Sequence, residues 1–82
     1  MILPRAAKAT GYTVADLTGP CRARPLAWTR FAIMAEMRAH GYSLPRIGRI
    51  LHRDHSTVLN GLRQAQALRG NPGFEIIRGA IA

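Results

Sequence analysis

The sequence predicts an all-α domain of about five helices that contains a helix-turn-helix. Apolar residues recur at the three- and four-residue spacing of helices, and glycine or proline stands where successive helices would begin and end. Two of the predicted helices are separated by a very short turn, which is the arrangement of a helix-turn-helix. With 82 residues, the chain can build one small core, so a single domain over residues 1–82 is expected.

The first two predicted helices are short. Residues 2–11 are rich in alanine and end at a glycine, a usual helix stop. Thr13 and Asp16 then have the spacing of a capping box, in which the hydroxyl accepts an early backbone N–H and the acid accepts one in return. A short helix follows these residues, and a basic linker is expected over residues 20–24.

A long helix is predicted over residues 25–40. Pro25 suits its first turn, because the N–H that proline lacks would be unpaired there in any case. Apolar side chains cover most of the circumference of this helix, which is typical of a central helix packed by several neighbours. These side chains are Leu26, Trp28, Phe31, Ile33, Met34 and Met37.

The helix-turn-helix is predicted over residues 43–69. Ser43 is a favoured N-cap residue, and Pro45 fits the first turn of a helix about two turns long. A tight turn at His52 then leads to Asp54, a second N-cap candidate, and to a helix that ends near residue 69.

The apolar C-terminal segment, residues 74–82, leaves two alternatives open. It can form a short helix that covers the core, or it can be a loose tail. The same segment is our candidate for a contact with a second copy of the chain or with another protein.

The charge of the chain points to a polyanionic partner. Twelve Lys and Arg residues against four acids give a formal net charge of +8, and all the basic residues except Lys8 are arginine. The planar fork of arginine matches phosphate oxygens and guanine edges, which favours nucleic acid over lipid headgroups. The alternative is a basic surface that serves only solubility.

Several classes of function are disfavoured. Cys21 is the only cysteine, so neither an internal disulfide nor a cysteine-rich zinc site can form. The acids and histidines show no metal-ligand spacing and no pairing of a nucleophile with a base. No export signal and no run of about 18 apolar residues is present. We expect a protein that is not an enzyme, uses no metal, cofactor or nucleotide, contacts no membrane, and works in the cytoplasm in association with the nucleoid.

The second helix of the helix-turn-helix has a polar outer face. At about 100° per residue, Ser56, Asn60 and Arg63 fall opposite the apolar side of this helix. Short or forked hydrogen-bonding groups at successive turns can enter a major groove about 12 Å wide and reach base edges. We expect Asn60 to contact a base and Arg63 a phosphate. The alternative is an ordinary solvated face.

Further arginines flank this helix in the sequence. Arg46 and Arg49 lie on the preceding helix, Arg53 lies in the turn, and Arg22 and Arg24 lie in the linker. Arginine contacts to phosphates fix the register of a base-reading helix without carrying sequence information themselves. The clustering favours duplex DNA as the partner.

Residues 43–59 resemble the signature of the C-terminal DNA-binding domain of the bacterial replication initiator DnaA. That pattern is close to S-L-P-x-I-G followed by R-D-H-[ST]-T-V, and the chain has both halves in this order. The resemblance extends over roughly residues 13–68. It implies an all-α fold of the Trp-repressor-like type, with the second helix of the pair in the major groove and the basic linker in an adjacent minor groove.

The resemblance also implies separate roles for single residues. Asp54 would accept from a cytosine amino group, His55 and Ser56 would meet thymine or neighbouring base edges, and Thr57 would hold a phosphate. Backbone amides at Leu44 and Pro45 would meet the sugar-phosphate chain. Phosphate contacts by Arg46, Arg49 and Arg53 are expected from their position around the helix, independently of the resemblance. The minor-groove arginine would be Arg22 or Arg24.

The chain departs from the DnaA pattern in three places. The glycine-containing turn of the family is replaced by Leu51 and His52 and is one residue shorter. Ser56 stands where threonine is common and lacks the methyl group that could pack on a thymine methyl. Gly61 lies inside the recognition helix, where glycine costs up to about 1 kcal/mol relative to alanine.

These observations lead to one main hypothesis and one alternative. The sequence contains no phosphate-binding loop of the type G-x-x-x-x-G-K-[ST], so we expect a DNA reader without ATP-driven activity. The main hypothesis is a sequence-specific double-stranded DNA-binding protein, either a transcription regulator or a replication factor of a phage, a prophage-like element or a bacterium. The alternative is a basic adaptor for an acidic protein such as a polymerase or replisome component. RNA binding is disfavoured, because aromatic stacking platforms are lacking.

Overall fold

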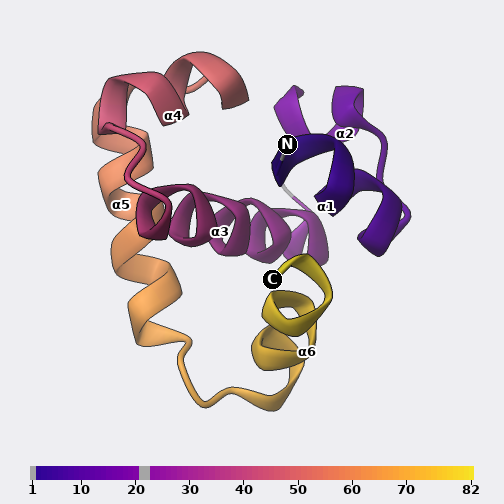
Figure 1. Cartoon of the computed structure of the whole chain (residues 1–82). Helices are drawn as coiled ribbons and strands as arrows, with labels where there is room; N and C mark the ends of the chain where they lie inside the picture. The colour runs from indigo at the N-terminus through magenta and orange to yellow at the C-terminus, as the bar shows by residue number, and fades with distance from the viewer. Residues whose placement is uncertain (1, 21–22) are drawn as a thin grey trace.

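The computed structural model describes residues 2–20 and 23–82, and these residues form six α-helices and no strand (Figure 1). The predicted all-α fold with a helix-turn-helix is therefore confirmed, with six helices in place of about five. The helices are α1 (Ile2–Thr10), α2 (Val14–Thr18), α3 (Arg24–Ala39), α4 (Leu44–Leu51), α5 (His55–Ala67) and α6 (Pro72–Ile81).

Helix α3 is the centre of the fold and contacts each of the other five helices. In Figure 1 it runs through the middle of the molecule, with α4 and α5 on one side and α1, α2 and α6 on the other. The predicted central position of this helix is thus confirmed. Within the described residues, no helix combines the length and the apolar composition that crossing a lipid bilayer requires.

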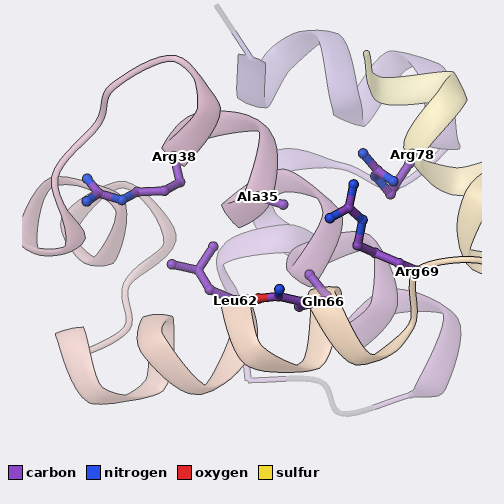
Figure 2. A pocket seen from close by; sticks show the side chains of 7 residues that line it. Ala35, Arg38, Leu62, Gln66, Arg69 and Arg78 are labelled. Atoms are coloured by element: carbon purple, nitrogen blue, oxygen red, sulfur yellow. The ribbon is translucent and has the colours of Figure 1, made fainter.

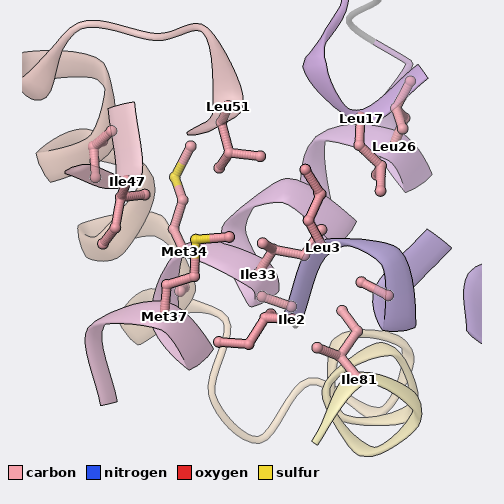
Figure 3. Packing of buried hydrophobic residues seen from close by; sticks show 14 of the residues in the cluster. Ile2, Leu3, Leu17, Leu26, Ile33, Met34, Met37, Ile47, Leu51 and Ile81 are labelled. Atoms are coloured by element: carbon pink, nitrogen blue, oxygen red, sulfur yellow. The ribbon is translucent and has the colours of Figure 1, made fainter. Parts of the chain in front are cut away.

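The hydrophobic core surrounds α3 and draws on all six helices (Figure 3). Burial of apolar surface is the main stabilising contribution in a domain of this size. The labelled core residues in the figure are Ile2, Leu3, Leu17, Leu26, Ile33, Met34, Met37, Ile47, Leu51 and Ile81.

The helix boundaries follow from local hydrogen bonds. The expected capping box is present, because the Asp16 N–H donates to Thr13 Oγ1 at 3.0 Å and the Thr13 N–H donates to Asp16 Oδ2 at 3.0 Å. Ser43 caps α4 by accepting from the Arg46 N–H at 3.3 Å. These side chains satisfy backbone donors that have no partner within the helix.

The C-terminal segment takes the first of the two alternatives and forms a helix. Asn71 caps α6 by accepting from the N–H groups of Gly73 and Phe74. Phe74 is fully buried, and its ring meets that of Trp28 edge to face with centroids 6.2 Å apart. Helix α6 therefore closes the core over the start of α3.

Gly61 has a packing role that explains its place inside α5. A Cβ atom at this position would overlap Sδ of Met34 and lie 3.4 Å from Cδ1 of Phe31. Both neighbours belong to α3, and Met34 is only 2% exposed. The glycine lets α5 approach α3 closely, which offsets its lower helix propensity.

Candidate nucleic-acid interface

The turn between α4 and α5 is tight and has a left-handed residue at its centre. Helix α4 ends at Leu51, and His52 follows with φ 56° and ψ 45°. This conformation favours glycine and costs other residues about 1 kcal/mol. His52 is the one described non-glycine residue with a positive φ.

Gly48 makes this short turn possible. Its carbonyl oxygen accepts from the Arg53 N–H at 2.8 Å, so the chain folds back directly over α4. A Cβ atom on Gly48 would overlap the Arg53 carbonyl oxygen and lie 3.6 Å from the Asp54 carbonyl carbon. Only a residue without a side chain fits between the helix and the turn.

The guanidinium of Arg53 is directed into the protein. Its Nη1 donates to the carbonyl oxygens of Thr18 at 3.1 Å and Leu51 at 2.9 Å, and its Nη2 donates to that of Gly19. These hydrogen bonds join the end of α2 to the turn before α5. A phosphate contact by Arg53 stays a prediction, and the positioning role was not foreseen from the sequence.

Arg30 holds the same end of α2 from the side of α3. It is only 5% exposed, and its Nε donates to the Leu17 carbonyl at 2.8 Å. Its Nη2 donates to the carbonyls of Asp16 at 2.6 Å and Gly19 at 2.8 Å. Two guanidinium groups thus satisfy the carbonyl oxygens at the C-terminal, negative end of a short helix. The sequence signal for this contact was Arg30 itself, the one charged residue between Arg24 and Glu36.

Helix α5 begins with a charged cap. Asp54 accepts the Thr57 N–H at 2.8 Å. This hydrogen bond, then one from the Thr57 side chain, and the nearby charge of His55 hold the pKa of the Asp54 carboxyl below its usual range. Asp54 is therefore an anion near neutral pH, placed at the start of the helix that carries the candidate base contacts.

The lowered pKa of Asp54 predicts a loss of stability in acid. Above about pH 4 the carboxyl is ionised in both the folded and the unfolded chain, and its contribution is fully present. As the pH falls through the pKa of the folded state, that contribution is lost. We expect the Tm of the wild type to fall more steeply than that of Asp54→Asn below about pH 4, in thermal unfolding followed by circular dichroism. Parallel curves would contradict this assignment.

The predicted DNA contacts of α5 and its cap lie on the open face of the helix. All six are exposed: Asp54, His55, Ser56 and Asn60, predicted to contact bases, and Thr57 and Arg63, predicted to contact phosphates. Val58, Gly61 and Ala65, on the opposite side of the helix, are buried against the core. Leu59 is 39% exposed and adds an apolar side chain one turn after His55. The sequence alone does not identify Leu59 as part of the site.

The predicted phosphate contacts at the start of α4 also lie on the surface. Arg46 and Arg49 are exposed, and the Arg46 guanidinium carbon lies 4.0 Å from the centre of the Tyr42 ring, which restricts its position. Pro45 is exposed and Leu44 half-buried. Because proline has no N–H, only Leu44 of this pair can donate a backbone hydrogen bond to a phosphate.

Of the two linker arginines, only Arg24 lies in the described part of the chain. Arg24 is the first residue of α3 and is exposed, so the helix begins one residue earlier than predicted. Arg22 lies outside the described residues. An open groove separates the end of α2 from the start of α5, and Thr57 and Asn60 line its α5 side.

These features define a helix-turn-helix domain with an exposed second helix. A family model described as "Bacterial dnaA protein helix-turn-helix" matches residues 1–65, and the chain belongs to this family. The chain is 44% identical over 61 residues to the chromosomal replication initiator protein DnaA of Picosynechococcus sp.. This match covers 72% of the chain but 14% of the initiator protein. The resemblance drawn from the signature is therefore confirmed.

Proposed function

We propose that this protein binds double-stranded DNA at a specific sequence, with α5 in the major groove. We further propose that it acts as a transcription regulator or replication factor of a bacterium, a phage or a prophage-like element. The observation that carries this proposal is the stripe of exposed hydrogen-bonding side chains on α5, at the end of a rigid, capped turn. Membership of the DnaA helix-turn-helix family supports DNA as the ligand.

The base contacts are assigned to the first turns of α5. A carboxylate has enough lone pairs to cap the helix and also to accept from a cytosine amino group, so Asp54 serves both purposes. His55, Ser56 and Asn60 address neighbouring base edges. Leu59, which is partly exposed beside them, supplies the apolar contact to a thymine methyl that Ser56 cannot make.

The phosphate contacts are assigned to the flanking surface. Arg46, Arg49 and Arg63 carry the charge, and Thr57 and the Leu44 N–H add neutral donors. Pro45 packs against the sugar-phosphate chain, and either Arg24 or Arg22 is the minor-groove arginine. Arg53 acts first by fixing the turn, because its guanidinium is bonded to carbonyl oxygens of α2 and α4.

Selection from random duplex DNA, followed by fluorescence anisotropy at several salt concentrations, tests the proposal. We expect one preferred site and an affinity that falls steeply with salt. His55→Ala and Ser56→Ala should relax the preference at one or two base positions. Arg46→Ala should weaken binding to every duplex alike and reduce the slope of log affinity against log salt concentration by about 1.

Two outcomes would contradict these roles. Equal binding to all duplexes would exclude sequence-specific reading, and no binding at low salt would favour the adaptor for an acidic protein. A uniform loss from all three substitutions would contradict the separation of base contacts from phosphate contacts. Arg5→Ala, on an exposed residue of α1, is the matched control and should leave both affinity and preference unchanged.

A further inference from the structure

A pocket with an apolar floor and a basic rim lies between α3, α5 and α6, toward the C-terminal end of α5 (Figure 2). At about 100° and 1.5 Å per residue, Leu62 in the pocket lies roughly 120° around the helix from Ser56, and roughly 10 Å along the helix axis from His55 on nearly the same side. The pocket is lined by Ala35, Arg38, Leu62, Ala65, Gln66, Arg69 and Arg78.

The rim of this pocket, hereafter the arginine pocket, brings together the positive charges of Arg69, after α5, and Arg78, on α6, whereas the guanidinium of Arg38 points away from them. Figure 2 shows Arg69 and Arg78 reaching over the pocket from one side, with Arg38 beyond Leu62 on the other. Arg78 pairs with Glu75 at 3.1 Å, and Arg38 donates to the Tyr42 carbonyl at 3.0 Å. Within the described residues, the exposed guanidinium of Arg69 makes no hydrogen bond or ion pair.

Among the residues that the structure describes, no acidic side chain lines the arginine pocket. The four acids of the chain are engaged elsewhere or at the edge: two are N-terminal helix caps, one pairs with His40, and one pairs with Arg78. They are Asp16, Asp54, Glu36 and Glu75, respectively. Neighbouring guanidinium groups repel one another, and an anion between them would relieve that repulsion.

We propose that the arginine pocket binds an acidic segment of a partner protein, with carboxylates on Arg69 and Arg78 and an apolar side chain against Leu62. A free phosphate would satisfy the arginines but would leave the floor of Ala35, Leu62 and Ala65 uncovered. A second copy of this chain carries a net charge of +8 and has its acids engaged as caps or ion pairs. Only a segment that combines carboxylates with an apolar residue matches both the rim and the floor.

The position of the pocket has a functional consequence. If α5 enters the major groove with its first two turns, the arginine pocket lies further along the helix, with Leu62 roughly 10 Å beyond His55. The protein could then hold DNA and the acidic segment together. This combination rests on the proposed function, whereas binding of the acidic segment alone does not.

The test uses a fluorescent peptide of aspartate and glutamate with a central leucine and phenylalanine. Its control is the same peptide with asparagine and glutamine in place of the acids. We expect saturable binding of the acidic peptide only, measured by anisotropy. The double substitution Arg69→Gln and Arg78→Gln should weaken it at least about tenfold, and Leu62→Ser should weaken it while leaving the charge unchanged.

The matched control is Arg5→Gln with Lys8→Gln, an equal loss of charge on exposed residues of α1. It should leave peptide binding unchanged, and the pocket variants should keep their affinity for the selected duplex. The proposal is overturned if the wild type does not bind the acidic peptide or if both double variants lose binding equally. Displacement of the peptide by duplex DNA would overturn only the simultaneous binding of DNA and the acidic segment. Thermal unfolding of each variant checks that it is folded, and Arg69→Gln alone, on an exposed side chain, repeats the test if the double variant is not.

Discussion

Replacing Gly48 with alanine should lower the unfolding free energy by about 3 kcal/mol and abolish specific DNA binding. The new methyl group would overlap the Arg53 carbonyl oxygen, which is backbone and cannot rotate away like the end of a side chain. Relief requires moving the turn, and with it the cap at Asp54 and the start of α5. The gain in helix propensity, about 1 kcal/mol at most, does not offset this clash.

The control is a second glycine inside a helix. A Cβ atom on Gly79, which lies in α6, would meet nothing within 4 Å. Gly79→Ala should therefore be neutral or stabilise by up to about 1 kcal/mol. Urea unfolding of both variants gives the comparison, and duplex binding of Gly48→Ala can be measured below its unfolding midpoint. Equal stability of the two variants would show that the turn tolerates a side chain.

The features predicted from the sequence are those set by local interactions. The capping box at Thr13 and the caps at Ser43 and Asp54 depend on hydrogen bonds between residues three apart. The exposed stripe on α5 follows from the helical period alone. For these features, the sequence pattern and the three-dimensional arrangement carry the same information.

The features that were missed depend on contacts between distant parts of the chain. Arg53 donates to carbonyls 34 and 35 residues away, and Arg30 to carbonyls 11 to 14 residues away. A guanidinium that binds backbone oxygens leaves no pattern in the sequence, because its partners can be any residue type. Composition therefore predicts an arginine at the DNA surface, although these two guanidinium groups are directed inward.

The roles of Gly61 and Leu59 were not predicted, for a related reason. From the sequence alone, a glycine inside a helix predicts only a loss of helix stability. Its packing role becomes visible with the neighbouring helix α3, whose Met34 leaves no room for a Cβ atom at Gly61. An apolar side chain on an amphipathic helix is expected to be buried, yet Leu59 is 39% exposed beside the candidate base contacts. Both assignments required the packing of α5 on α3.

Arg30→Ala should be the other strongly destabilising substitution, with a loss of about 3 kcal/mol or more. The side chain is 5% exposed, and its removal leaves the carbonyls of Asp16, Leu17 and Gly19 without these charged donors. Hydrogen bonds to charged groups contribute about 1.5–3 kcal/mol each, and a buried acceptor left unpaired adds its desolvation penalty. Arg38→Ala, on an exposed arginine of the same helix, should change stability by no more than about 0.5 kcal/mol.

A double-mutant cycle of Arg30→Ala and Arg53→Ala then tests whether the two arginines hold the end of α2 together, as distinct from a general effect of lost charge. Arg30 and Arg53 both bind carbonyl oxygens at the end of α2. If loss of either arginine releases that end, the other loses its partners as well, so the double alanine variant should lose less stability than the two single losses combined. Additive losses would mean that the two arginines act independently. If the end of α2 sets the path of the basic linker, Arg30→Ala at temperatures where it stays folded should also reduce the preference for a narrow minor groove, whereas Arg38→Ala should not. Together these results would show that the position of the linker depends on the turn before α5, through the two guanidinium groups that hold the end of α2.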